Sequence, residues 1–383
     1  MTNNYQFDFQ PLTRVLCGPG VLTKLGETVR DLGGKRILLV TDPGLEDAGH
    51  PQRAEQILKQ AGLGIIVFDG VEENPTTKHV AAGLLVAQRE KIDFIVAIGG
   101  GSAMDCAKGI NFLLTNGGSM KDYWGVGKAT KPMLPSVGIP TTAGTGSEAQ
   151  SFALISDPVT HFKMACGDKK AAFKVAFLDP ELTLTQPTRV AALTAMDALT
   201  HSVEAHVSTK SSPLSKTFSR EAWRLLEAHV VTALTKPTDL AARAAVQWGA
   251  FLAGLAIENA MLGAAHALAN PLTAHYGLVH GQAVGQLLPH VVRYNGSVVN
   301  GDYADLLHAA NIPQATGNAA EALAQRILEI AEVAELPRNL HSQGVSEGML
   351  SVLADEAAQQ WTSKFNPRPV GYAELLSLYR SAL

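Results

Sequence analysis

The chain has 383 residues, 46% of them hydrophobic and 17% charged, which excludes intrinsic disorder and indicates about two domains. Its formal net charge is −4, and lysine and arginine form no dense run, so we expect no nucleic-acid partner. No apolar stretch of 18 residues and no leader-like N-terminus occur, which predicts neither membrane insertion nor export. Three widely spaced cysteines, Cys17, Cys106 and Cys166, favour a reducing cytoplasm over a disulfide framework.

The first half of the chain alternates β-branched runs with helical stretches. Residues 36–42, 64–69 and 93–98 are predicted strands, and their continuous apolar character is typical of parallel strands that are covered on both faces. Their spacing of about 28 residues fits one strand, one helix and two turns. The pattern predicts an α/β domain over residues 1–187.

From about residue 190 onward, alanine, leucine, histidine and glutamate predominate, which predicts an all-helical domain over residues 188–383. The predicted helices are residues 191–207, 217–234, 240–269, 282–293, 317–335 and 347–360. Residues 244–257 are apolar nearly all round, so we expect a buried central helix there. A cleft between the two domains is the expected place for a ligand.

A glycine-rich turn, Gly99-Gly100-Gly101-Ser102, follows the third predicted strand and leads into a helix that contains Asp105. Backbone without Cβ atoms can approach a phosphate closely, and the free N–H groups of a helix start attract its charge. The turn therefore predicts a pyrophosphate cradle. The alternative is a strand-to-helix turn whose glycines only permit close packing.

A second loop, residues 140–148, places hydroxyls and glycines after the strand-like residues 135–139. Thr141, Thr142 and Thr145 could bind another part of a nucleotide, while Thr145 and Glu148 also have the spacing of a helix capping box. Asp42 ends the first predicted strand, where a carboxylate can bind an adenosine ribose and repel a 2′-phosphate. It favours NAD over NADP, although it could equally be a turn residue before Pro43.

Four candidate metal ligands occur in the second half of the chain. Asp197 and His201 are one helical turn apart, so both can bind one cation. His266 and His280 would be about 21 Å apart on a straight helix, so the chain must turn between them, and Asn270-Pro271 and Tyr276-Gly277 are the candidate breaks. One carboxylate with three imidazoles suits Fe²⁺ or Zn²⁺. Glu204 is expected to face solvent or to bond a ligand histidine.

Several motifs in chain order resemble those of the iron-containing (group III) alcohol dehydrogenases. They are GGGSAMDCAK at 99–108, PTTAGTGSE at 140–148, LDPELT at 178–183, MDALTHSVE at 196–204, HG at 280–281, LLPHVVRYN at 287–295 and NPRP at 366–369. The resemblance covers essentially the whole chain. It implies a dinucleotide-binding α/β domain, an all-helical catalytic domain, a divalent metal and a homodimer.

The resemblance also assigns roles by position. The implied metal ligands are Asp197, His201, His266 and His280, and the implied cofactor residues are Asp42, Asn74, Gly101, Ser102, Thr141, Thr142, Lys163 and Leu182. The family name favours iron, although zinc also suits the ligands. Many members carry a further histidine at the position of Asn270, which puts proton transfer there in doubt, and His275 is the candidate substitute.

The expected activity is hydride transfer between NAD(H), rather than NADP(H), and a small alcohol or aldehyde. Residues 244–292 contain no arginine or lysine, and Leu262, Ala265, Leu268 and Leu272 are apolar, so an uncharged substrate is expected. The alternatives are an enzyme for an acidic substrate, such as a maleylacetate-reductase-like or dehydroquinate-synthase-like enzyme, and a catalytically silent nucleotide-binding scaffold.

Overall fold

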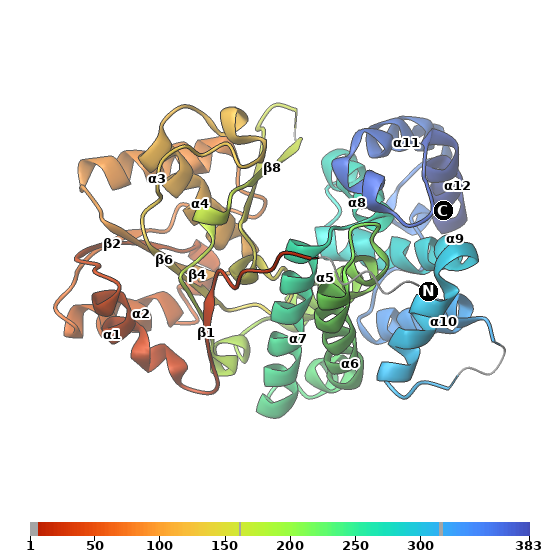
Figure 1. Ribbon diagram of the computed structural model, residues 1–383, viewed down its shortest axis with the longest axis horizontal. Coiled ribbons are helices and arrows are strands. Elements are labelled where there is room, and N and C mark those ends of the chain that lie inside the picture. The colour runs from red at the N-terminus through yellow and green to blue at the C-terminus, as the bar shows by residue number, and fades with distance from the viewer. Residues whose placement is uncertain (1–6, 161, 314–316) are drawn as a thin grey trace. The chain divides into compact units, whose positions relative to one another are not determined.

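The computed structural model describes residues 7–160, 162–313 and 317–383 of the chain (Figure 1). These residues cluster into two compact units. The α/β unit comprises Gln10–Thr142 and Ser147–Gln186, and the helical unit comprises Pro187–Leu383 with residues 7–9 and Ala143–Gly146. The predicted fold class, an α/β domain followed by a helical domain, is confirmed.

A six-stranded parallel sheet forms the centre of the α/β unit. In order across the sheet, its strands are β1 (Arg14–Cys17), β9 (Val175–Leu178), β6 (Ser136–Pro140), β4 (Phe94–Gly99), β2 (Arg36–Val40) and β3 (Gly64–Phe68). A smaller sheet contains β5 (Gly125–Val126), β8 (Lys163–Gly167) and β7 (Phe152–Ser156). The three strands predicted at residues 36–42, 64–69 and 93–98 are β2, β3 and β4.

Helices cover both faces of the large sheet, as Figure 1 shows. They are α1 (Leu25–Asp31), α2 (His50–Gln60), α3 (Thr77–Arg89) and α4 (Gly101–Asn116). Leu38 and Val40 of β2 pack in one core with α3 and α4, whereas Ile37 and Leu39 pack in another with α1 and α2. Because successive side chains of a strand point to opposite faces, a strand covered on both sides is apolar throughout.

The helical unit contains eight helices in its described residues. They are α5 (Thr188–Val207), α6 (Pro213–Thr235), α7 (Leu240–Asn259), α8 (Ala264–Tyr276), α9 (His280–Ala309), α10 (Ala319–Val333), α11 (Leu350–Gln359) and α12 (Tyr372–Ala382). Apart from Thr194, every residue from Ala191 to Val207 is buried. The helix predicted over residues 244–257 is part of α7, whose residues there are all buried or half-buried, as expected, and α5 is buried more completely still.

One predicted helix, residues 240–269, is two helices in the structure. It ends at Asn259 and restarts at Ala264 after a short irregular segment. The predicted break at Asn270-Pro271 is wrong, because Pro271 lies inside α8. The Tyr379 hydroxyl donates a hydrogen bond to the Leu268 carbonyl, close to the point where a proline interrupts the helical hydrogen bonds.

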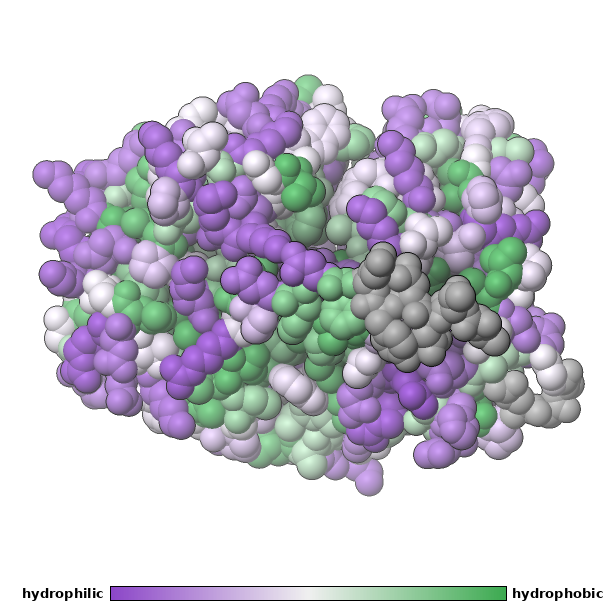
Figure 2. Space-filling model, in the orientation of Figure 1, coloured by the Kyte–Doolittle hydropathy of each residue, from purple (hydrophilic) through white to green (hydrophobic). Residues whose placement is uncertain are grey.

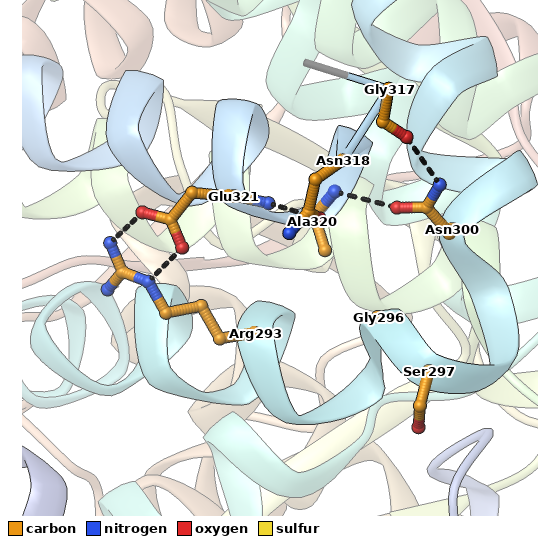
Figure 3. Close-up of a pocket in the computed structure, with 8 residues that line it drawn as sticks. All are labelled: Arg293, Gly296, Ser297, Asn300, Gly317, Asn318, Ala320 and Glu321. Carbon is orange, nitrogen blue, oxygen red and sulfur yellow. Dashed lines mark hydrogen bonds and ion pairs between the residues drawn. The ribbon is translucent and has the colours of Figure 1, made fainter.

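Gly296 of α9 and Ala320 of α10 are among the residues that line a pocket (Figure 3), and the two helices approach each other closely at this glycine. A Cβ atom on Gly296 would lie 2.5 Å from the Ala320 Cβ, so no other residue fits without movement. Arg293 pairs with Glu321 at 2.8 Å, and the Asn300 side chain accepts a hydrogen bond from the Ala320 N–H at 3.1 Å. These contacts hold the start of α10 against α9.

Among the described helices, α7 alone is long and apolar enough to span a membrane by those two criteria. Of its most apolar window, 67% is buried inside the protein, and a core helix passes the same test. On the face that Figure 2 shows, hydrophilic residues predominate at the margin and hydrophobic residues gather in the lower middle. Cys17, Cys106 and Cys166 are free thiols.

Candidate metal and coenzyme sites

The four candidate ligands lie together in the helical unit. Asp197 and His201 belong to α5, His266 to the first turn of α8, and His280 is the first residue of α9. The Asp197 Oδ1 lies 3.3 Å from the Nε2 of His201, 3.5 Å from that of His266 and 3.8 Å from that of His280. Three imidazole nitrogens thus surround one carboxylate oxygen.

These distances are close to those between ligand atoms that bind one and the same cation. In a tetrahedral site whose ligand atoms lie about 2.1 Å from the ion, those atoms are about 3.4 Å from each other. The Asp197 Oδ1 and the His266 Nε2 are buried and have no hydrogen-bond partner among the described residues. Buried polar atoms without a partner are costly, and coordination to a metal would satisfy both. Asp197, His201 and His266 offer ligand atoms that all lie within 4.8 Å of one another, so these three fit a divalent ion, and His280 lies beside Asp197 as a further donor.

The charges of the site point the same way. Burial opposes ionisation of Asp197, but the imidazoles of His201, His266 and His280 hold the pKa of this carboxyl well below its usual range. Burial also opposes a charge on His266, yet the carboxylates of Glu204 and Asp197 raise the pKa of this histidine to about 9. The two carboxylates therefore favour positive charge at this point, which a proton or a metal ion can supply.

A turn between α8 and α9 brings His280 to the cluster. Gly277 ends α8 in a left-handed conformation with φ +65°, so the break predicted at Tyr276-Gly277 is confirmed. The first turn of α9 then packs on α5, where a Cβ atom on Gly281 would lie 2.1 Å from the Leu193 carbonyl oxygen. Only glycine allows this approach, which places His280 beside Asp197.

Glu204 is buried, so the alternative that it faces solvent is wrong. It lies on α5 and is only 3% exposed. Its Oε2 accepts a hydrogen bond from the Nδ1 of His266 at 2.6 Å, which confirms the other expectation. The carboxylate thus fixes the imidazole so that Nε2 faces Asp197.

His275 does not join the cluster. It is nine residues beyond His266 on α8, two and a half helical turns, which places it on the opposite face about 13 Å along the axis. Its Nε2 forms a hydrogen bond with the Oε1 of Glu356 on α11 at 2.8 Å. Asn270 is one turn from His266, and its amide donates a hydrogen bond to the Gln360 side chain at 3.0 Å.

The apolar side chains of α8 are part of the hydrophobic core, so they say nothing about the polarity of the candidate metal site. Ala265, Leu268 and Leu272 are fully buried in the hydrophobic core of the helical unit. Their spacing of three and four residues makes them the core-facing stripe of the helix. The expectation of an uncharged substrate therefore rests on the missing lysine and arginine residues alone.

In the α/β unit, the glycine turn connects β4 to α4. Gly100 is the N-cap and Gly101 the first residue of α4, and no side chain caps this helix start. Gly99 has φ +150°, and a Cβ atom there would lie 2.8 Å from the Ala103 Cβ and 2.9 Å from the Asp42 Oδ2. The backbone of the turn is thus tight and free of side chains, which suits a phosphate ligand.

Asp42 lies beside this turn. It follows β2 and precedes a short 3-10 helix, Pro43–Leu45. Half-burial raises the pKa of its carboxyl, while a hydrogen bond from the Gly44 N–H opposes the rise. The carboxylate is therefore close to the backbone that would hold a pyrophosphate.

Two other predicted cofactor residues contact each other. The Lys163 ammonium, on β8, donates a hydrogen bond to the Asn74 side chain at 3.1 Å. Asn74 has a left-handed conformation with φ +53°. Leu182, by contrast, is 1% exposed and packs in the core that contains α1 and α2.

The predicted threonine loop is divided between the two units. Thr141 and Thr142 follow β6, and the Thr142 side chain would lie 3.5 Å from a Cβ atom on Gly100. Thr145 belongs to the segment Ala143–Gly146, which clusters with the helical unit. There, a Cβ atom on Gly144 would lie 2.4 Å from the Thr194 Cβ. The helix expected after the loop is a 3-10 helix of three residues, Ser147–Ala149.

Asp105 is engaged inside the α/β unit, with a partner that the sequence analysis did not identify. Its Oδ1 accepts a hydrogen bond from the Ser147 hydroxyl at 2.6 Å and lies 3.9 Å from the Lys108 ammonium. Lys108 is 2% exposed and donates hydrogen bonds to Ser147 and to the Phe152 carbonyl. The signal available in the sequence was a lysine three residues after an aspartate in an apolar helix.

Residues 12–180 match the family model described as iron-containing alcohol dehydrogenase, and residues 191–383 match the C-terminal model of the Fe-containing alcohol dehydrogenase family. Alcohol dehydrogenase 4 of Schizosaccharomyces pombe is 36% identical over 96% of this chain and 87% of its own length. The 1,3-propanediol dehydrogenase of Klebsiella pneumoniae is 36% identical over 95% of this chain and 96% of its own.

A solved structure of a 1,3-propanediol oxidoreductase covers 99% of this chain and 100% of its own, with 35% identity and a TM-score of 0.95. Family models, relatives and fold agree over nearly the whole length. The chain belongs to the iron-containing alcohol dehydrogenase family and is an alcohol dehydrogenase-type oxidoreductase.

Proposed function

We propose that this protein is a metal-dependent, NAD(H)-linked alcohol dehydrogenase and aldehyde reductase. The observation that carries the proposal is the group of three imidazole Nε2 atoms within 3.3 to 3.8 Å of the Asp197 Oδ1. Asp197, His201, His266 and His280 would hold the cation. Iron is the first choice because of the family, and zinc also suits these ligands.

When bound, a divalent cation acts as a Lewis acid toward an alcohol or carbonyl oxygen. Asp197 offsets one of its two charges, while three neutral imidazoles leave the site electrophilic. The Gly99–Gly101 turn would bind the pyrophosphate of the coenzyme with its backbone N–H groups, and Asp42 would bind the adenosine ribose. The nicotinamide supplies the hydride chemistry, so the protein contributes placement and charge.

We further propose a small, uncharged alcohol or aldehyde as the substrate. Residues 190–209 and 244–292, which contain all four proposed ligands, have neither lysine nor arginine to bind a carboxylate or phosphate. Relatives named for alcohols and for 1,3-propanediol support the same class. Turnover of acidic carbonyl compounds in preference to neutral ones would contradict this substrate class.

The experiment is purification without oxygen, followed by elemental analysis and removal of metal with a chelator. We expect about one metal per chain, loss of hydride transfer on removal, and recovery with Fe²⁺ or Zn²⁺. NAD reduction and NADH oxidation are then measured against neutral and acidic alcohols and carbonyls. Full activity in metal-free protein would overturn the metal dependence.

We also propose that the protein is a homodimer, the oligomeric state that the family resemblance implies. Light scattering on the purified protein measures it directly, and a mass of about 81 kDa, twice that of the 40.5 kDa chain, is the expected result. A monomer at working concentration would contradict it.

A further inference from the structure

Side chains accept hydrogen bonds from three consecutive N–H groups at the start of α8. Gly263 and Ala265 donate to the two carboxylate oxygens of Glu204 at 3.0 and 2.6 Å. Ala264, between them, donates to the Asn366 Oδ1 at 3.3 Å. The N–H groups at a helix start have no partner within the helix, so here buried side chains replace water. His266 is the next residue.

The side chains of Glu204 and Asn366 pack closely against the backbone of Gly263. A Cβ atom on Gly263 would lie 2.9 Å from the Glu204 Oε1 and 3.1 Å from the Asn366 Oδ1. Any larger residue would push these two side chains apart. The position of the start of α8 is therefore fixed by two contacts. Glu204 of α5 provides one, and Asn366 of the C-terminal segment provides the other.

Asn366 is itself fixed by a second amide. Its Nδ2 donates to the Asn295 Oδ1 at 2.8 Å, and the Asn295 Nδ2 donates back to the Asn366 Oδ1 at 3.1 Å. The Asn366 Nδ2 also donates to the Arg368 carbonyl at 2.6 Å. Asn366 is 4% exposed and Asn295 is 1% exposed. This pair joins two of the sequence motifs, residues 287–295 and 366–369, to which no role has been given.

The rest of the C-terminal motif is anchored on α9. The Arg368 guanidinium lies 4.0 Å from the centre of the Tyr294 ring and donates to the Tyr294 carbonyl at 2.9 Å. The Tyr294 hydroxyl donates to the Pro369 carbonyl at 2.6 Å. A cation over an aromatic ring and two hydrogen bonds thus keep Asn366 in place.

We propose that Glu204, Asn366 and Asn295 are positioning residues of the metal site, which fix the first turn of α8 and thereby the direction of the His266 imidazole. Glu204 acts on the ring directly through Nδ1, and the amide pair acts through the backbone of Ala264. The inference rests on the proposed function, because it concerns the same metal. It adds that residues 366–369, far from the ligands in sequence, control metal affinity.

The test compares metal dissociation constants of the full chain and of three variants. Glu204→Gln keeps the shape of the side chain but replaces one accepting oxygen with an NH₂ group. Asn366→Leu keeps the approximate size of the side chain and removes all of its side-chain hydrogen bonds. Asn111→Leu is the matched control, because Asn111 is 2% exposed, lies in the α/β unit and exchanges hydrogen bonds with Leu134 at 2.9 and 3.0 Å.

Zn²⁺ affinity is measured by competition with a chromogenic chelator, and NADH binding by fluorescence serves as the control for folding. We expect Glu204→Gln to weaken Zn²⁺ binding about 10- to 100-fold and Asn366→Leu about tenfold, the range for residues that orient metal ligands. Asn111→Leu should stay within about twofold of the parent for Zn²⁺. All three variants should retain NADH binding.

Two results would overturn the inference. If the parent binds Zn²⁺ and both Glu204→Gln and Asn366→Leu bind it equally well, the positioning role alone is wrong. If the parent binds neither Zn²⁺ nor Fe²⁺, the proposed function fails and the inference fails with it. Should Glu204→Gln fail to fold, Asn366→Leu decides the question, because it leaves the contact between Glu204 and His266 untouched.

Discussion

The two candidate sites are built from different parts of the chain. The glycine turn consists of consecutive residues, and its binding groups are backbone N–H groups at the start of α4. The candidate metal site consists of the side chains of Asp197, His201 and His266, which are buried, and of His280, which is partly exposed. A substitution in the turn acts by steric exclusion, whereas a substitution of Asp197 removes charge from the candidate metal site. The two sites should therefore respond to substitution separately.

The largest effect is expected from Asp197→Asn, which keeps the shape of the side chain and removes its charge. Metal affinity should fall more than about 100-fold, beyond the range for residues that only orient ligands, and turnover should fall with it. Elemental analysis after dialysis and steady-state kinetics measure the two effects. NADH affinity should stay within about twofold of the parent, and a variant that keeps its metal would contradict the ligand assignment.

Gly99→Ala should produce the opposite pattern. Its methyl group would meet Ala103 and Asp42 at under 3 Å, at a φ that side chains rarely adopt. We expect NADH to bind about 10- to 100-fold more weakly, which corresponds to the usual 1–3 kcal/mol of local strain, while bound metal is unchanged. Fluorescence titration measures the NADH affinity.

Gly62→Ala is the matched control for this substitution. Gly62 also has a positive φ, +79°, but nothing lies within 4 Å of a Cβ atom there. It should lose some stability and no NADH affinity. Equal losses of NADH affinity in the two variants would mean that strain in the α/β unit, rather than the turn itself, controls binding.

A pH effect should arise from His206, a buried histidine of α5. Burial and the nearby Lys216 lower the pKa of His206 to about 4, so this histidine is neutral in the folded protein at neutral pH. In the unfolded chain its pKa is about 6.5, so the unfolded state gains a proton first as the pH falls. The contribution of His206 to the free energy of unfolding is therefore full above pH 6.5 and is lost as the pH falls toward 4.

His206→Asn should remove this part of the pH dependence. Between pH 7 and pH 5 the parent should lose about 2 kcal/mol more unfolding free energy than the variant, measured by urea denaturation. The same loss in both proteins would assign the acid sensitivity to other groups.

The smallest effect concerns coenzyme choice. Asp42→Ala removes the carboxylate beside the glycine turn, so the ratio of kcat/KM for NADP to that for NAD should rise about tenfold, as for loss of one hydrogen bond to a charged group. Metal content should not change. An unchanged ratio would make Asp42 a turn residue only.

Sequence reasoning performed best where one local pattern determines the structure. The apolar runs at residues 37–40 and 94–98 predict strands β2 and β4, and Ile37 and Leu38 face different cores. The glycine turn was predicted because a strand, glycines and a helix follow one another directly. Neither prediction needed knowledge of distant residues.

Contacts between distant residues decided the features that were missed. Pro271 looked like a helix break, but α8 continues through it, and Tyr379 of α12 bonds a carbonyl of that turn. Glu204 could have faced either way on α5, and its direction depends on the N–H groups of Gly263 and Ala265. No periodicity in the sequence contains such information.

We propose that one divalent cation binds among the candidate ligands of α5, α8 and α9. The most direct test is anomalous X-ray diffraction at the iron and zinc absorption edges from crystals of protein purified without oxygen. The account predicts one strong peak between the Asp197 Oδ1 and the Nε2 atoms of His201, His266 and His280. No peak there, or a peak only at other residues, would contradict it.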